Sequence, residues 1–213
     1  MFFTFEGIEG SGKSTVHKRI ATHLTQKGLD VLVTREPGGS TLGRNLRSVL
    51  LDTRTEGLNP RAELYLFLAD RAQHVSEVIK PALDAGQIVL CDRYIDSTLA
   101  YQGFGRGMDV DHLVILNDIA TSTLKPDLTI LLDLPVKIGL ERAGARNRNE
   151  GTVISEGRFE SESINFHERI RNGYLTLAKE NPERFAIIDS TQSQEDVFIQ
   201  CIATIEKYIE KNL

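Results

Sequence analysis

The chain has 213 residues, of which 40% are hydrophobic and 26% are charged, and these values are ordinary for a single globular domain with a buried core. Its net charge of −5 argues against non-specific binding of nucleic acid, so anionic ligands would have to be held by local groups of arginines. No hydrophobic run approaches the roughly 18 residues of a membrane-spanning helix, and the N-terminus lacks the pattern of a signal peptide. The two distant cysteines predict neither a disulfide nor a zinc site, so a reducing cytoplasm is expected.

Short hydrophobic runs alternate with longer helical patterns along the chain. The runs are continuous, as in parallel strands covered on both faces, and strands are expected at 2–5, 29–34, 88–91, 128–132 and 185–188. Helices are expected at 13–27, 42–51, 61–79, 95–101, 111–122, 136–143, 161–180 and 195–209. Pro81 is expected to end or kink the third helix. The alternation predicts one α/β domain over residues 1–213, with a doubly wound parallel sheet of about five strands.

A complete phosphate-binding loop follows the first predicted strand. Residues 7–14 fit the pattern G-x-x-x-x-G-K-[ST], with a strand before the loop and a helix after it. The glycines let successive backbone N–H groups point toward one phosphate, and the positive end of the helix adds to that field. Lys13 can reach the β- and γ-phosphates, and the Ser14 hydroxyl can ligate Mg²⁺. The nucleotide-binding residues predicted here are Gly7, Ile8, Glu9, Gly10, Ser11, Gly12, Lys13 and Ser14.

A turn signal, Pro-Gly-Gly, follows the second predicted strand at residues 37–39. In a doubly wound sheet, ligands bind at this carboxyl edge of the strands. Arg35, with Arg47 a little further on, can therefore bind a second phosphate. The alternative is a surface turn with solvated arginines.

The helix expected at 61–79 carries an aromatic ring and a charged side chain on one face. Phe67, Arg71 and His74 share that face because they fall at i, i+4 and i+7. A ring beside an arginine can stack on a base and hydrogen-bond its edge. The alternative is that Phe67 belongs to the core and Arg71 is a solvated ion-pair partner. We expect His74 to be structural.

An aspartate and an arginine follow the third predicted strand. Asp92 stands at a Walker-B position, which supports Mg²⁺ directly or through water, and Arg93 would emerge beside the phosphates. The next helix presents hydroxyl groups toward the same cavity from Tyr94, Ser97, Thr98 and Tyr101. The alternative is an amphipathic helix with small polar residues.

The segment 142–158 is polar, rich in Gly, Asn and Arg, and without helical periodicity. It is expected to be a mobile lid loop inside the domain. Solvation is the ordinary role of charge on a loop. In a nucleotide site, arginines that arrive on closure can neutralise charge on the transferred phosphoryl group while water is excluded. The arginines of this segment are Arg142, Arg146, Arg148 and Arg158.

In their order and spacing these motifs resemble those of the thymidylate kinase family, over residues 5 to about 191. The resemblance lies in residues 5–10, 34–39, 92–94, 97 and 100–103. It implies a P-loop NTPase fold of the nucleotide kinase type, with an inserted lid loop. It also implies transfer of the γ-phosphoryl group of ATP to dTMP, giving dTDP and ADP, with Mg²⁺ as cofactor and a homodimer as the assembly.

The resemblance implies a role for each matching residue on the substrate side. Glu9 matches the residue that contacts the sugar hydroxyl of dTMP. Phe67 matches the ring that stacks on thymine, and Arg71 matches the residue that reads its carbonyl edge. Ser97 and Thr98 match positions that contact the base.

It also implies roles near the phosphates. Tyr101 matches the ring that excludes a 2′-hydroxyl, and Arg35 and Arg93 match phosphate-binding positions. The family's lids often end in Asp-Arg-[Ile/Phe]-Glu, whereas residues 157–160 read Gly-Arg-Phe-Glu after a longer lid, so the acting lid arginine stays open. The residues expected at the reacting phosphoryl group are Lys13, Arg93, Arg148 and Arg158, with Ser14 and Asp92 for the metal.

Two other classes share parts of this pattern. Another nucleoside or nucleoside-monophosphate kinase would share the loop and lid, and the base-side residues favour thymidylate. A regulatory GTPase would also need D-x-x-G, which occurs nowhere, and [NT]-K-x-D, for which residues 124–127 are only a near match.

Overall fold

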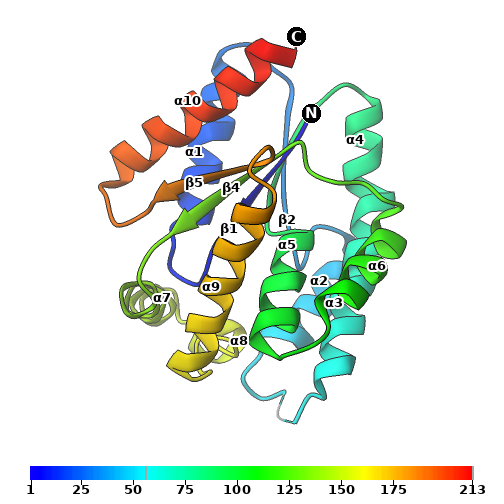
Figure 1. The fold of residues 1–213 in the computed structure, drawn as a ribbon, viewed down its shortest axis with the longest axis vertical. Helices are drawn as coiled ribbons and strands as arrows, with labels where there is room; N and C mark the ends of the chain where they lie inside the picture. Colours follow the sequence, from blue (N-terminus) through cyan, green and yellow to red (C-terminus); the bar gives the residue numbers. More distant parts are fainter. Residues whose placement is uncertain (56, 213) are drawn as a thin grey trace.

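A parallel sheet lies at the centre of the molecule (Figure 1), which is a computed structural model describing residues 1–55 and 57–212. Among the described residues the sheet has five strands in the order β2-β3-β1-β4-β5. All four strand pairs are parallel, which confirms the predicted doubly wound sheet. The strands are β1 (Phe2–Glu6), β2 (Val31–Arg35), β3 (Ile88–Asp92), β4 (Leu128–Asp133) and β5 (Phe185–Asp189).

Helices fill the intervals between the strands. They begin with capping side chains where the sequence supplies them: Ser40 accepts from Gly43 N, and Ser163 accepts from Phe166 N. The α-helices are α1 (Lys13–Gln26), α2 (Thr41–Leu51), α3 (Pro60–His74), α4 (Lys80–Asp84), α5 (Ile95–Thr98), α6 (Val110–Thr121), α7 (Val136–Glu150), α8 (Val153–Glu156), α9 (Ile164–Glu180) and α10 (Gln194–Asn212). The π-helical segments are η1 (Val75–Ile79) and η2 (Leu99–Gly105).

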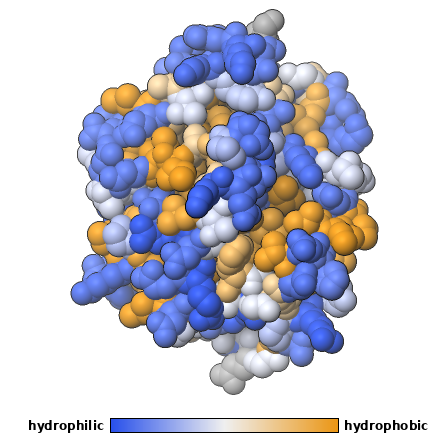
Figure 2. Space-filling model, in the orientation of Figure 1, coloured by the Kyte–Doolittle hydropathy of each residue, from blue (hydrophilic) through white to orange (hydrophobic). Residues whose placement is uncertain are grey.

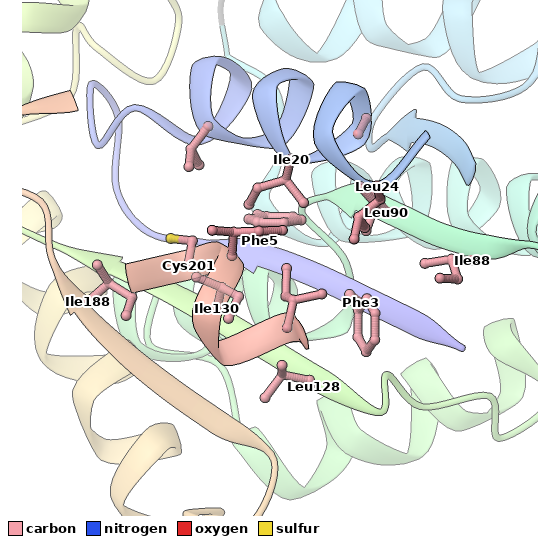
Figure 3. Close-up of a cluster of buried hydrophobic side chains, with 14 of the residues drawn as sticks. Phe3, Phe5, Ile20, Leu24, Ile88, Leu90, Leu128, Ile130, Ile188 and Cys201 are labelled. Atoms are coloured by element: carbon pink, nitrogen blue, oxygen red, sulfur yellow. The ribbon is translucent and has the colours of Figure 1, made fainter. Parts of the chain in front are cut away.

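Helices cover both faces of the sheet, so the central strands β1, β3 and β4 are almost entirely buried, whereas the edge strands β2 and β5 are partly exposed. On one face, α1 and α10 pack on the sheet through a hydrophobic cluster that includes Phe5, Ile20 and Cys201 (Figure 3). On the other face, α3, α6, η2 and α9 enclose a second cluster. This arrangement leaves the carboxyl ends of the strands as the open edge of the domain.

Pro81 was expected to end or kink the helix predicted over residues 61–79, and it does not end it, because helical structure continues to residue 84. The chain passes through the π-helical segment η1 and continues as α4 to Asp84. The N–H of Lys80 bonds to Val75 O, one residue further back than in an α-helix. Proline lacks an N–H, and here it stands in the first turn of α4, where that group is not needed.

The segment 142–158 is mostly helical, so the prediction of a loop there was wrong. Helix α7 continues to Glu150, Gly151 ends it at a φ of 68°, and α8 follows. The periodicity escaped detection because the buried stripe of α7 includes glycine and asparagine in place of larger hydrophobic residues. That stripe is Val136, Gly139, Ala143 and Asn147.

Across the described ranges, no helix has both the length and the hydrophobicity that crossing a bilayer requires.

Candidate active site

The phosphate-binding loop connects β1 to α1 and adopts conformations that only glycine accepts readily. Gly10 has a φ of 70°, and a Cβ added there would lie 2.0 Å from Gly139 O in α7. Lys13 donates from Nζ to Gly7 O and Ile8 O, each at 2.8 Å. Burial lowers the pKa of Lys13 to about 8, with Arg93 as the next cause. A phosphate would restore the positive charge of this lysine to full strength.

Ser14 and Asp92 form the part of the site that suits a divalent cation. Ser14 Oγ donates to Asp92 Oδ2 at 2.8 Å, while the buried Asp92 Oδ1 has no hydrogen-bond partner among the described residues. Burial raises the pKa of Asp92, but Lys13 and Arg93 outweigh it and hold the carboxyl below its ordinary value. The described residues contain no cluster of three or more protein ligands. A single carboxylate and a hydroxyl beside nucleotide phosphates fit Mg²⁺.

One cavity of about 680 Å³ joins the phosphate loop to the base-side residues. It opens at the carboxyl edge of the sheet, as expected for this fold. The predicted site residues that line it are Glu9, Gly10, Ser11, Gly12, Lys13, Ser14, Arg35, Phe67, Arg71, Asp92, Arg93, Ser97, Thr98 and Tyr101. Residues from four separate stretches of the chain, 9–14, 35, 67–71 and 92–101, therefore meet at one place.

Arg71 is buried, with 1% of its surface exposed, so it is not a solvated surface arginine. Its Nε donates to Glu36 Oε2 at 2.8 Å, and its Nη2 donates to Tyr94 O at 2.8 Å. Its Nη1 donates to Thr98 Oγ1 and to Asn117 Oδ1, each at 2.6 Å. These contacts engage four of the five N–H groups of the guanidinium, among the described residues.

His74 belongs to the same buried network and has no access to the cavity. Its Nδ1 lies 2.9 Å from Glu36 Oε1, and its Nε2 lies 2.6 Å from Thr34 Oγ1. The ring thus orients Glu36, which in turn holds Arg71. This is the structural role expected for His74.

Three aromatic rings form a wall of the cavity. The centroid of Phe159 lies 6.2 Å from that of Phe67 and 5.3 Å from that of Tyr101, with the Tyr101 ring edge-on. Phe67 is half-buried, whereas Phe159 is buried. A flat ligand can stack on Phe67 only where Phe159 leaves room for it.

Arg93 follows β3 with a φ of 69°, which is a strained conformation for a residue with a Cβ. The turn directs its guanidinium toward the phosphate loop, where Nη2 donates to Glu9 Oε1 at 3.2 Å. The guanidinium also lies 4.9 Å from the ring centroid of Tyr101. Strain of this kind is typical of functional sites, and here it holds a cation between the two halves of the cavity.

The lid arginines lie in two different settings. Arg142 and Arg146, one turn apart on α7, line the cavity. Arg148 is exposed on α7 and is not among the lining residues. Arg158 also lies away from the cavity lining, because its Nη1 donates to Glu63 Oε2 at 2.7 Å and its Nε donates to Leu50 O. The structure therefore does not bring Arg148 and Arg158 together with Lys13.

Sequence patterns predict no role for Glu6, a buried polar residue that contacts residues of the site. Glu6, fully buried, accepts from Tyr94 N at 2.8 Å, Ser97 Oγ at 2.6 Å and Tyr174 OH at 2.8 Å. Burial, and then the charge of Asp96, raise the pKa of Glu6 to about 7.

The sequence of α9 contains a pattern that could have indicated two further residues near the site. His167 and Tyr174 stand with Ile170 on its buried stripe, although a hydrophobic stripe ordinarily excludes titratable groups. A polar residue on such a stripe indicates a buried polar partner on a neighbouring element.

Comparison with known proteins agrees with this geometry. The family model described as thymidylate kinase matches residues 5–200. A thymidylate kinase from Desulfovibrio desulfuricans is 65% identical over 211 residues, which cover 99% of this chain and 97% of that protein. A thymidylate kinase from Nitratidesulfovibrio vulgaris is 58% identical, over 93% of this chain and 92% of that protein.

A solved structure shows the same similarity at the level of the fold. The crystal structure of thymidylate kinase from Ehrlichia chaffeensis matches with a TM-score of 0.76 and 34% identity, and the match covers 97% of this chain and 98% of that one. The family match over residues 5–200 spans the phosphate loop, the predicted base-side residues and the segment after β4. The chain belongs to the thymidylate kinase family.

Proposed function

We propose that this chain transfers the γ-phosphoryl group of ATP to dTMP and releases dTDP and ADP. The observation that carries the proposal is the single cavity joining Lys13 and Ser14 on one side to Phe67 and Arg71 on the other. Two nucleotides held at opposite ends of one cavity can react without separate diffusion steps, which lowers the barrier substantially. The expected location is the cytoplasm, and the whole chain acts as one P-loop kinase domain.

The base side of the cavity suits thymine. Phe67 offers a ring face for stacking, and the remaining N–H of Arg71 Nη2 can donate to a thymine carbonyl. Ser97 and Thr98 line the same end of the cavity. The ring of Tyr101 packs beside the expected position of the sugar, where it excludes a 2′-hydroxyl.

The phosphate side of the cavity supplies positive charge at the reacting groups. The attacking oxygen of dTMP is already ionised, so positioning and charge neutralisation carry the reaction and no strong base is needed. Lys13 binds the terminal phosphates of ATP, Arg93 and Arg35 bind the phosphate of dTMP, and Ser14 and Asp92 would hold Mg²⁺. When bound, Mg²⁺ supplies further neutralisation at the β- and γ-phosphate oxygens.

The lid segment completes the site by excluding water. Arg142 and Arg146 already line the cavity and are the arginines best placed to neutralise the transferred group. Arg148 and Arg158 would reach it only after the segment moves, because Arg158 is bound to Glu63.

A homodimer is the assembly that we propose. Helix α6 exposes hydrophobic side chains, with Ile115 57% and Ile119 72% exposed. Figure 2 shows hydrophobic residues gathered over the position that α6 occupies in Figure 1. A second copy would bury this surface. Light scattering on the wild type and on Ile119→Glu would then report a dimer and a monomer respectively.

The test of the proposed reaction is the release of ADP from ATP and Mg²⁺ with dTMP, dUMP, dGMP, dCMP or UMP offered separately. A strong preference for dTMP is expected. Equal turnover of a different monophosphate would retain a nucleoside-monophosphate kinase but contradict the thymidylate assignment. No turnover with any of them would contradict the proposed reaction.

A further inference from the structure

Side chains from three separate parts of the chain surround the Glu9 carboxylate. Tyr101 OH donates to its Oε1, and Arg93 Nη2 donates to the same oxygen at 3.2 Å. The other oxygen, Oε2, lies 3.2 Å from Nδ1 of His167 in α9. The carboxyl is only 8% exposed, so these partners fix its orientation within the cavity. Oε2 and His167 Nδ1 are both buried, and neither makes a hydrogen bond among the described residues, so the two atoms lie within ion-pair distance of each other only.

His167 is fully buried, and oxygen atoms from two other residues lie beside its ring. Its Nε2 lies 3.0 Å from the backbone oxygen of Phe159, which can only accept a hydrogen bond. Its Nδ1 faces the Glu9 carboxylate. Both ring nitrogens therefore lie close to oxygen atoms. Burial raises the pKa of Glu9, but His167 and then Arg93 outweigh it and keep the carboxyl ionised.

We propose that His167 is a positioning residue, which lies against the buried Oε2 of Glu9 and so fixes the carboxylate where it lines the cavity, within reach of the free hydroxyl of the dTMP sugar. This inference rests on the proposed function, in which Glu9 contacts that hydroxyl. A 2′-deoxyribose 5′-monophosphate has only one free hydroxyl, at the 3′ carbon. Because Phe159 lies just after α8, His167 also joins the carboxylate of the phosphate loop to the end of the lid segment.

The test compares kcat and KM for dTMP with those for 3′-deoxythymidine monophosphate, which lacks the hydroxyl. The wild type is expected to prefer dTMP at least about tenfold, since a hydrogen bond to a charged group contributes that much. His167→Leu should lose most of the preference, mainly through KM for dTMP. His167→Gln should retain most of it, because its amide N–H can donate to Glu9. In a Glu9→Gln background, His167→Leu should change the preference no further.

A matched control separates positioning from the loss of a buried ring. His17, also buried, lies 2.9 Å from Leu90 O and makes no contact with Glu9, so His17→Leu should lose stability and keep the preference. His167→Met fills the same space with a flexible side chain and repeats the test if His167→Leu does not fold.

Two results would overturn the inference in different ways. If His167→Leu and His167→Met lose equal activity toward both substrates, the histidine has a structural role only. A wild type that turns over dTMP but does not distinguish the two substrates would remove the Glu9–hydroxyl contact, while the proposed reaction would stand.

Discussion

Ser14 donates its hydroxyl to Asp92 across the end of the sheet, and this contact joins the phosphate loop to the strand that carries the acidic residue. The bond occupies one carboxylate oxygen and leaves the other directed into a buried space without a partner among the described residues. Asp92→Asn should therefore raise the Mg²⁺ concentration needed for half-maximal activity, by about tenfold to a hundredfold. Titration of activity with Mg²⁺ measures this shift. Asp189→Asn, at the exposed end of β5, is the control and should titrate like the wild type.

Phe67 should contribute to the binding of dTMP more than to the stability of the fold. Stacking of a base on an aromatic ring is worth roughly 1–3 kcal/mol, so Phe67→Ala should raise KM for dTMP about tenfold to a hundredfold. KM for ATP should stay within about twofold, because the ring lies at the other end of the cavity. Tyr65→Ala on the same helix, where the side chain is 61% exposed, should leave both constants unchanged. A larger rise in KM for ATP than in KM for dTMP would contradict the placement of the base on Phe67.

The contact between α7 and the phosphate loop has no room for a methyl group. A Cβ on Gly139 would lie 2.5 Å from Glu9 O, whereas one on Gly144 would meet only the mobile end of Arg148, at 3.3 Å. Gly139→Ala should thus destabilise the protein by about 1–3 kcal/mol and raise KM for ATP. Gly144→Ala should be neutral or stabilise the helix by up to about 1 kcal/mol. Urea unfolding of both variants checks the difference, and equal stabilities would contradict it.

The buried carboxyl of Glu6 should make stability depend on pH in a defined window. Burial raises its pKa from 4.5 to about 7, so the folded state binds a proton that the unfolded state has released. Between these values, stability falls as pH rises, by up to about 3 kcal/mol from this one group. Glu6→Gln removes the titration. The unfolding free energies of the wild type and of this variant are measured from pH 4 to 8. The value for the wild type should fall relative to that of the variant as pH rises from 4.5 to about 7. A constant difference would show that Glu6 titrates normally.

Much of the fold and the nucleotide site follows from local patterns in the sequence. Strands such as β1 and β4 are continuous hydrophobic runs. This pattern predicts their positions, because a strand that is buried on both faces does not alternate hydrophobic with polar residues. The phosphate loop is a contiguous motif whose geometry depends on its own glycines. Phe67 and Arg71 were predictable together because one helix face presents both.

The remainder depends on pairs that are distant in the chain. Arg158 meets Glu63, and His167 meets Glu9, and in neither pair does one residue's neighbourhood indicate its partner. The helix over 142–150 escaped prediction for a related reason, since its buried stripe contains Gly139 and Asn147, whose burial only the tertiary structure explains. Sequence patterns thus identify the residues that face the cavity more readily than the residues that hold them in place.

Four of the five N–H groups of Arg71 are already bound within the protein, and this affects selectivity among bases. A guanidinium already fixed by its neighbours needs no ordering when a nucleotide arrives, so little conformational entropy is lost. Its remaining N–H is removed from water once a base covers it, and it then requires an acceptor. Thymine and uracil supply a carbonyl oxygen at this edge, whereas cytosine presents an amino group. A cytosine nucleotide would leave one buried donor facing another, so rejection of the wrong base arises from the cost of an unmet hydrogen bond.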